Sequence, residues 1–474
     1  MPTHRRDFTW FLSTICLAAG LRADAVDLGA ARVNVTPTEP IRLTGYAVRK
    51  SPHIGVEQQL WAKALAIGSD RQGAAVLLTL DNCGIAEETW REVRRRLSKS
   101  AGIRSDHVVI ACSHTHSAPA TTHWAPNIFV RDLTAEEQAA IDRYTLGLIG
   151  KLEEVALAAL KNRQPGRLSW AQGTVGFAAN RRTRGGPVDQ ALPVLKAETT
   201  NGTLVALVAN YACHCTTLGG EFNHVCGDWA GYAQEAMERL APGVVGLVTI
   251  GCGADANPSP RGGADGGLAL AKQHGEAVAN EVKQLLGRSF TPLTARLSTK
   301  SREIQLPFSP HFTRDQWLAR STNSGIVGYH ARKWLARLER GEKPPKSLDY
   351  PITTWNFGNE LALVFLPGEV VVDYALRLKG ELDASRLWVS GYANYVPCYI
   401  PSRRILAEGG YEAEDSLWYY DRPARISTDA EDLIVRTVRG LLPGSFRIDS
   451  KKAGLPLLQR AVQSSTETGS GVIR

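Results

Sequence analysis

The segment Val194-Leu-Lys-Ala-Glu-Thr-Thr-Asn-Gly-Thr-Leu-Val-Ala-Leu-Val-Ala-Asn210 decides how this chain is expected to fold. Two apolar runs, Val194–Glu198 and Thr203–Asn210, have the length and composition of buried β-strands. Between them lies Asn201-Gly202, the strongest short signal for a two-residue hairpin turn. The segment therefore predicts a β-hairpin within a larger sheet.

On both sides of this hairpin, strand and helix patterns alternate for most of the chain. Thr134 and Glu137 form a capping box, which marks the start of a long helix. The other predicted strands are Ala74–Leu80, His107–Ala111, Val244–Ile250, Leu361–Phe365 and Arg386–Ser390, and the predicted helices are Ala86–Ser98, Thr134–Asn162, Trp229–Leu240, Gly267–Leu286, Val370–Lys379 and Asp429–Leu442. This alternation predicts an α/β fold with a large mixed β-sheet core and helices on both faces.

The composition is that of a globular protein. Of its 474 residues, 43% are hydrophobic and 22% charged, with a formal net charge of +8. The densest basic stretch, Arg91–Lys99, is interpreted as the exposed face of a helix, with a docking site for anionic lipid as the alternative. No aromatic platform or Gly-rich loop accompanies it, so we expect no nucleic-acid partner. No segment beyond the first 25 residues is apolar enough for a transmembrane anchor, and the oligomeric state is not indicated.

The N-terminus has the pattern of an export signal. Basic residues in Met1–Phe8 precede the short apolar run Thr9–Leu21 and the small-residue site Ala23-Asp-Ala25. Arg5-Arg6 resembles a twin-arginine signal, with an ordinary secretory signal as the alternative. We therefore expect residues 1–25 to be a signal peptide, and the protein to be exported to the periplasm or the extracellular space. Residues 26–445 are expected to form the functional domain and residues 446–474 a disordered tail.

Short polar motifs follow the predicted strands. They are Ser113-His-Thr-His116, His214, Gly251-Cys-Gly-Ala-Asp-Ala-Asn257, Pro367-Gly-Glu369 and Gly391-Tyr-Ala-Asn-Tyr395. In α/β sheets, ligands bind outside the carboxyl ends of the strands. An active site is therefore predicted at the C-terminal ends of the strands.

The histidines of these motifs indicate a metal centre. His114 and His116 are two residues apart, so an extended chain would place both rings on one face, as two ligands or as a ligand and a proton carrier. The alternative is a pair of polar loop histidines. His214 and Glu369 could complete a catalytic zinc site, which takes about three N or O ligands and keeps one position open. The cysteines include no CxxC pair and are predicted to be mostly small buried residues.

Together these motifs resemble the neutral (non-lysosomal) ceramidases, zinc amidases that release a fatty acid from ceramide. The matching segments are His114-Thr-His-Ser-Ala-Pro119, His214-Cys-Thr-Thr217, Gly227-Asp-Trp-Ala-Gly-Tyr232, Pro367-Gly-Glu369 and Gly391-Tyr-Ala-Asn-Tyr-Val-Pro-Cys-Tyr399. The resemblance runs in order from about Leu28 to Leu442 and includes Gly45-Tyr46 and Asn180-Arg181. We expect no counterpart of the C-terminal β-sandwich of the full-length family members.

The resemblance implies a zinc ion (Zn²⁺) held by His114, His214, Glu369 and Tyr399. Tyr395 is an alternative to Tyr399 as the tyrosine ligand, and a core tyrosine without a ligand role is another. His116 matches a residue that is not a ligand, and it is assigned to proton transfer to the leaving amine. Arg181 is assigned to stabilising the developing oxyanion, with a surface arginine as the alternative.

The chain departs from the family at a serine that is important for activity, where it has Asn257. An asparagine cannot be a nucleophile, so the expected mechanism uses zinc-activated water, with Asn257 in a positioning role. Nearby Asp255 either orients a histidine or water, or caps the turn. The predicted function is an exported zinc-dependent hydrolase that cleaves the amide bond of a small amphiphilic substrate, ceramide or another N-acyl amine. The alternative is a secreted, non-enzymatic zinc protein descended from a ceramidase.

Overall fold

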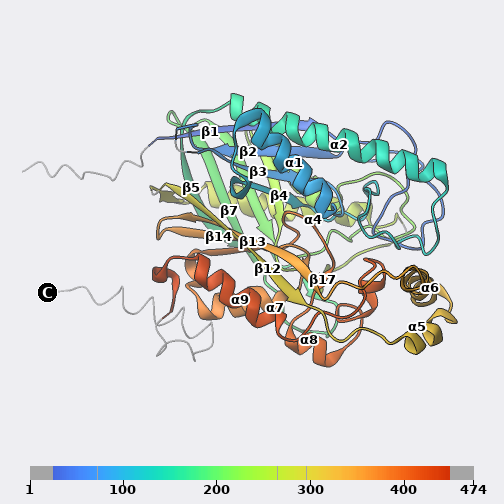
Figure 1. The fold of residues 1–474 in the computed structure, drawn as a ribbon. Coiled ribbons are helices and arrows are strands. Elements are labelled where there is room, and N and C mark those ends of the chain that lie inside the picture. The colour runs from blue at the N-terminus through green and yellow to red at the C-terminus, as the bar shows by residue number, and fades with distance from the viewer. Residues whose placement is uncertain (1–24, 72, 264, 295, 449–474) are drawn as a thin grey trace, which may run out of the picture.

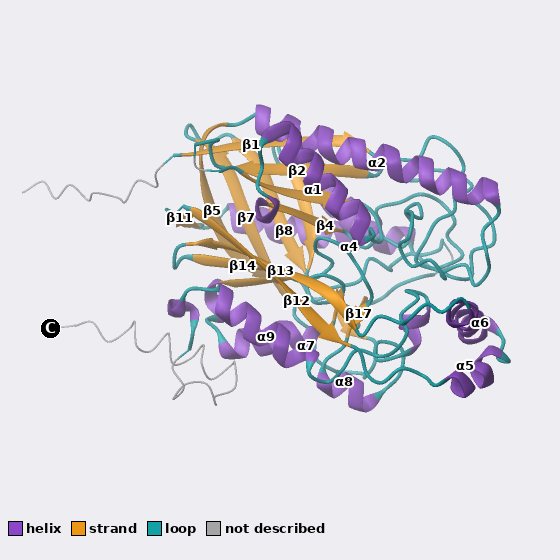
Figure 2. Ribbon diagram, viewed as in Figure 1, coloured by secondary structure: helices purple, strands orange, loops and turns teal. Residues whose placement is uncertain are grey.

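The computed structural model describes residues 25–448 except 72, 264 and 295. The predicted signal peptide, apart from residue 25, and most of the predicted tail therefore lie outside the described residues. The fold is α/β, as predicted, and it has four layers (Figure 1, Figure 2). Two β-sheets are stacked at the centre, and helices cover the outer face of each sheet.

The larger sheet has nine strands among the described residues, in the order β4-β3-β2-β1-β5-β7-β8-β9, with β11 paired to β5. It is mixed, because β3–β4 and β8–β9 are parallel and the other pairs are antiparallel. The predicted hairpin is its β7–β8 pair. The strands are β1 (Val26–Asn34), β2 (Trp61–Ile67), β3 (Ala75–Leu80), β4 (Val108–Cys112), β5 (Gln164–Thr174), β7 (Ala191–Thr199), β8 (Leu204–Tyr211), β9 (Val245–Ile250) and β11 (Thr291–Leu293).

A second sheet, in the order β12-β13-β14-β16, packs against the inner face of the first. Its strands are β12 (Leu297–Pro307), β13 (Ser347–Phe357), β14 (Leu361–Phe365) and β16 (Leu387–Ser390). Leu77 of the first sheet and Trp355 and Phe365 of the second belong to the apolar layer between them. The sequence did not predict β12, because most of its side chains are polar and exposed.

The helices lie on the two outer faces. α1 (Glu87–Ala101), α2 (Ala135–Lys161), α3 (Asp228–Glu238) and α4 (Leu268–Leu286) cover the larger sheet, and α7 (Val372–Glu381) and α9 (Ala430–Leu441) cover the smaller one. The predicted capping box is present at Thr134 and Glu137. The remaining helices are α5 (Arg314–Ser321), α6 (Gly325–Glu339) and α8 (Arg403–Glu408), and short strands are β6 (Ala178–Asn180), β10 (Ala256–Pro258), β15 (Glu369–Val370) and β17 (Tyr399–Ile400).

The basic stretch Arg91–Lys99 was the one candidate docking surface in the sequence. The basic stretch lies on α1, where Arg91 pairs with Glu87 and Arg95 and Arg96 pair with Glu92. These intrahelical pairs satisfy much of its charge, in agreement with an exposed helix face.

Among the described residues, none of the helices combines the length and the apolar character needed to cross a membrane.

Candidate metal centre

Four residues distant in the sequence meet beyond the carboxyl ends of four strands. His114 follows β4 and His214 follows β8, while Glu369 and Tyr399 begin β15 and β17, which come after β14 and β16. β15 and β17 pair in parallel with Glu369 opposite Tyr399, so the sheet register itself places these two side by side. All four are at most 3% exposed. The site thus lies at the strand ends, where the polar motifs predicted it.

The donor atoms of these residues converge on one point. Glu369 Oε2 lies 3.1 Å from both His114 Nε2 and His214 Nε2, and Tyr399 Oη lies 3.2 Å from His214 Nε2. The histidine and carboxylate donors all lie within 4.8 Å of one another. Ligands of a tetrahedral zinc at about 2.0–2.1 Å are separated from each other by roughly 3.3 Å. The donor set therefore fits a zinc ion in both chemistry and spacing.

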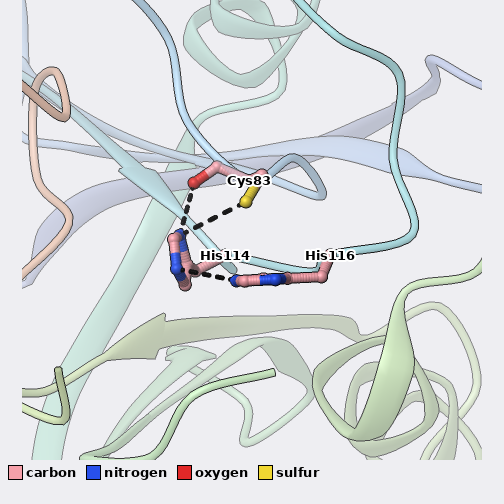
Figure 3. A group of neighbouring side chains, drawn as sticks. All are labelled: Cys83, His114 and His116. Carbon is pink, nitrogen blue, oxygen red and sulfur yellow. Dashed lines mark hydrogen bonds between the residues drawn. The ribbon is translucent and has the colours of Figure 1, made fainter. Parts of the chain in front are cut away.

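His114 and His116 come together in a different way from the one predicted. His114 has a φ of +58°, in the left-handed region, so the chain turns after β4 and is not extended there. The two rings still lie close, with centroids 4.7 Å apart and their planes nearly perpendicular (Figure 3). A non-glycine residue in this conformation is strained, and such strain is concentrated at functional sites.

Backbone carbonyl oxygens hold the two histidines that could bind a metal. His114 Nδ1 lies 2.6 Å from the carbonyl oxygen of Cys83, and His214 Nδ1 lies 2.9 Å from that of Gly253 (Figure 3). A carbonyl can only accept a hydrogen bond, so each Nδ1 carries the proton. Each Nε2 therefore presents its lone pair to the point where the donors converge, the arrangement that zinc-binding histidines need.

Side chains hold Glu369 and Tyr399, the two candidate oxygen ligands. The Tyr420 hydroxyl donates to Glu369 Oε1, the carboxylate oxygen that does not contact the histidines. Arg181 Nη2 donates to Tyr399 Oη at 3.0 Å, and Arg181 Nε donates to Glu412 at 2.7 Å. Arg181 is thus no isolated surface arginine, because it lies between Glu412 and the site.

Burial and neighbouring charge shift the pKa values of the site in ways that suit a cation. Burial alone would raise the pKa of Glu369, but His114 and His214 hold it well below its usual range. Burial, together with the nearby Arg181, lowers the pKa of His214 to about 4, so the ring is neutral at pH 7. Burial raises the pKa of Tyr399 well above its usual range, against the opposing effect of Arg181. A metal ion would reverse that shift by favouring the phenolate.

His116 lies at the partly exposed side of the cluster. Its Nε2 is 3.1 Å from His114 Nε2, a distance that fits either a further ligand or a neighbouring proton carrier. Burial and the adjacent His114 lower its pKa well below the usual range. Gly45 is required beside it, because its φ is +88° and an added Cβ would lie 2.5 Å from the His116 ring.

The other predicted site residues are placed as follows. Tyr395 points away, with its hydroxyl donating to the carbonyl oxygen of Asp349, so Tyr399 is the tyrosine that reaches the site. Asp255 accepts hydrogen bonds from Val372 N at the start of α7, at 2.8 Å, and from Asn180 Nδ2, at 3.1 Å. Asn257 is partly buried, and its Oδ1 accepts from Thr216 Oγ1 at 3.2 Å, two residues beyond His214.

Sequence reasoning missed several residues around the site. The Tyr392 ring is tilted by 37° against the His114 ring, with centroids 4.5 Å apart, and the Tyr411 ring lies 5.5 Å from that of Tyr399. Tyr420 and Glu412 contact a ligand and Arg181, but no fixed spacing links them to any motif. Only Tyr392 carried a signal, because it stands inside the Gly391–Tyr395 motif.

Cys83 forms a second metal-capable group with His114 and His116. Its sulfur lies 3.6 Å from His114 Nδ1, whereas His116 approaches the opposite nitrogen of the same ring (Figure 3). The sulfur thus approaches Nδ1, the ring nitrogen whose proton is donated to the Cys83 carbonyl oxygen and which has no free lone pair for a metal. Cys83 and the other six cysteines within the described ranges are free and buried, as predicted.

The chain matches the sequence profile described as "Neutral/alkaline non-lysosomal ceramidase, N-terminal" over residues 27–246. It is 22% identical over 490 residues to the neutral ceramidase of Pseudomonas aeruginosa, covering 86% of this chain and 72% of that protein. It is also 23% identical to neutral ceramidase A of Dictyostelium discoideum, over 45% of this chain and 32% of that protein.

Two solved structures share the fold. One is a ceramidase complexed with C2, with a TM-score of 0.69, 17% identity, and coverage of 90% of this chain and 77% of that one. The other is the neutral ceramidase from Pseudomonas aeruginosa, with a TM-score of 0.69, 19% identity, and coverage of 90% and 76%. Its sequence match over residues 27–246 and its shared fold make the chain similar to the neutral/alkaline non-lysosomal ceramidases.

Proposed function

We propose that this protein is a zinc-dependent amidohydrolase that cleaves the amide bond of an amphiphilic N-acyl amine. The convergence of His114, His214 and Glu369 donors at one buried point is the observation that carries the proposal. Ceramide is the first candidate substrate, because the relatives are named neutral ceramidases. The ceramide assignment is the finer part of the proposal, and the amidohydrolase activity does not depend on it.

The proposed zinc ligands are His114 Nε2, His214 Nε2, Glu369 Oε2 and Tyr399 Oη. Two imidazole nitrogens and a single carboxylate favour zinc over magnesium or calcium, which prefer sites made of oxygen ligands. When bound, zinc supplies a Lewis acid that polarises a carbonyl group and makes water a better nucleophile near neutral pH.

His116 is the proposed proton carrier. Its Nε2 adjoins His114 at 3.1 Å, and its buried Nδ1 has no hydrogen-bond partner among the described residues, so the ring is free to exchange a proton beside the site. Its lowered pKa keeps the ring neutral at pH 7. A neutral imidazole can take a proton from the attacking water and deliver it to the departing amine nitrogen.

Arg181 and Asn257 are the proposed substrate contacts. Arg181 uses Nε and Nη2 to bind Glu412 and Tyr399, and its Nη1 makes no hydrogen bond within the described part of the chain. This nitrogen is available to stabilise the negative charge that develops on the carbonyl oxygen. Asn257 Nδ2 likewise has no hydrogen-bond partner in the described residues, so it can donate to the substrate although it cannot attack it.

We further propose that the protein is exported. The proposal rests on the basic start, the short apolar run and the small-residue cleavage site of residues 1–25. N-terminal sequencing of the protein recovered from the medium or periplasm tests it. A mature chain that begins near residue 26 supports export, and an intact N-terminus in the cytoplasm contradicts it.

The enzymatic proposal is tested by metal analysis combined with a panel of acyl-amide substrates. We expect one zinc per chain and hydrolysis that chelation abolishes and zinc restores. The variant Asn257→Ser then tests the choice of ceramide as substrate separately from the amidohydrolase activity. If this variant gains ceramide hydrolysis, the natural site is adapted to another amide, and if the unaltered chain already cleaves ceramide efficiently, ceramide is its substrate.

A further inference from the structure

We propose that Tyr420 is a positioning residue that fixes Glu369 as a ligand through one oxygen only. This inference rests on the proposed zinc site. Tyr420 lies outside every sequence motif described above, 51 positions from Glu369.

The two oxygens of Glu369 have separate partners. Oε2 faces both histidines at 3.1 Å, whereas Oε1 accepts the hydrogen bond from the Tyr420 hydroxyl. Among the four proposed ligands, the carboxylate has the most freedom, because it can rotate or bind a cation through both oxygens. A donor on Oε1 removes that freedom and directs Oε2 to the point where the donors converge.

Tyr420 is itself held rigidly. It is only 7% exposed, and its ring packs against Trp124 with centroids 5.7 Å apart. The next residue, Asp421, has a φ of +58° and is bound by Arg337 of α6. Asn127 also binds this segment, donating to the carbonyl oxygen of Trp418 at 2.8 Å. The hydroxyl is therefore preorganised for Glu369 by contacts from two other parts of the chain.

Tyr420→Phe removes the hydroxyl and keeps the ring that packs on Trp124. Partners that orient a metal ligand typically contribute a factor of about 10–100 in metal affinity. We expect Tyr420→Phe to weaken zinc binding by a factor in this range, measured by chelator competition on the full chain, with the melting temperature of the metal-free protein unchanged. The matched control is Tyr419→Phe, because the Tyr419 hydroxyl makes no hydrogen bond within the described residues.

A double-mutant cycle tests whether Tyr420 acts through Glu369. In a Glu369→Ala background the carboxylate is gone, so adding Tyr420→Phe should cause no further loss of zinc affinity. The proposal is overturned if the second loss equals the first, or if Tyr420→Phe and Tyr419→Phe bind zinc as tightly as the unaltered chain. If the unaltered chain binds no zinc, the proposed function fails and this inference fails with it.

Discussion

The two histidine ligands and the two oxygen ligands are held by different kinds of partner. Backbone carbonyls of Cys83 and Gly253 hold His114 and His214. Side chains hold the oxygen ligands, Tyr420 at Glu369 and Arg181 at Tyr399. His114 and His214, here called the histidine half, lie within residues 27–246, the part of the chain that matches the family profile, and Glu369 and Tyr399, the oxygen half, lie beyond it.

This difference predicts where the site tolerates substitution. A backbone carbonyl is present whatever the residue type, so Cys83 needs no particular side chain to hold His114, whereas an added Cβ at Gly253 would lie 2.5 Å from the backbone of Ala212. The partners of the oxygen ligands are specific hydroxyl, guanidinium and carboxylate groups, so a single substitution removes them. We therefore expect zinc binding to be insensitive to the side chain of Cys83, which supports the histidine half, and sensitive to the side chains that support the oxygen half.

The largest effect is expected from removing a ligand of the histidine half. His214→Ala takes away a nitrogen donor that contacts both oxygen ligands. Metal catalysis contributes several kcal/mol, and each 1.36 kcal/mol is a tenfold change in rate, so kcat/KM should fall by roughly 10³ or more. Zinc content after dialysis should fall in parallel. A variant that keeps one tightly bound zinc would refute the ligand assignment.

His116 belongs to the same half but should behave differently. As a proton carrier, its replacement in His116→Ala should lower kcat by roughly 10²–10⁴ and leave the zinc content nearly intact. Parallel measurement of metal content and turnover distinguishes the two roles. If zinc is lost together with activity, His116 is a ligand.

Acid should destabilise the metal-free protein through His214. Its pKa is about 4 in the folded chain, against about 6.5 when unfolded, so folding favours the neutral ring. The neutral ring contributes fully to the free energy of unfolding above about pH 6.5. This contribution, roughly 3 kcal/mol in all, is lost as the pH falls toward 4. Urea denaturation between pH 7.5 and 4.5 measures this loss.

His330 is the comparison for that experiment. It is buried near α5, its pKa is also lowered to about 4 by burial, and it lies outside the metal centre. Replacing either histidine with Gln should reduce the pH dependence of the unfolding free energy by a similar amount, but only His214→Gln should affect zinc binding. An unchanged pH dependence in His214→Gln would show that this ring does not lose its charge on folding.

A smaller effect is expected from a supporting residue of the oxygen half. Glu412→Gln removes the charge that binds Arg181, which in turn donates to Tyr399. Zinc affinity should fall by about 10-fold, at the lower end of the range of about 10–100-fold that is typical for partners that orient metal ligands. Glu408→Gln is the control, because Glu408 pairs with Arg182 and Arg404 but not with Arg181. Equal losses in both variants would mean that Arg181 does not transmit the effect.

The smallest effect is expected at Cys83. Cys83→Ala removes a buried sulfur but keeps the carbonyl oxygen that accepts from His114 Nδ1. Zinc affinity should therefore remain within about threefold of the unaltered chain, a change of less than about 1 kcal/mol. Chelator competition measures it, and a tenfold loss would show that the thiol also supports His114 and that the two halves do not differ as described.

Local signals in the sequence predicted local structure well. The Asn201-Gly202 hairpin and the Thr134 capping box are both present, because each depends on a few adjacent residues. The second sheet was missed as a separate layer, because neither β12, whose side chains are mostly polar and exposed, nor the largely buried β13 was predicted from the sequence. The left-handed backbone of His114 was also missed, because its conformation depends on packing in the folded protein.

The motifs named the four residues whose donors converge and, of their supporting side chains, only Arg181. Tyr420 and Glu412 reach the site from a loop that no short motif marks, and their contacts exist only in the folded chain. Choosing Tyr399 over Tyr395 likewise needed coordinates, since both follow the same strand. The catalytic and ligand roles of all these residues remain predictions for the measurements above.

The two-residue pairing of β15 with β17 has a consequence for how this site can change in evolution. Glu369 and Tyr399 are aligned by hydrogen bonds between their own backbones, and they follow the neighbouring parallel strands β14 and β16. The alignment does not depend on how much chain connects α7 to β16. An insertion at residues 382–386 should therefore leave both oxygen ligands in register, whereas a one-residue insertion between Ser390 and Tyr399 should shift the pairing and separate them.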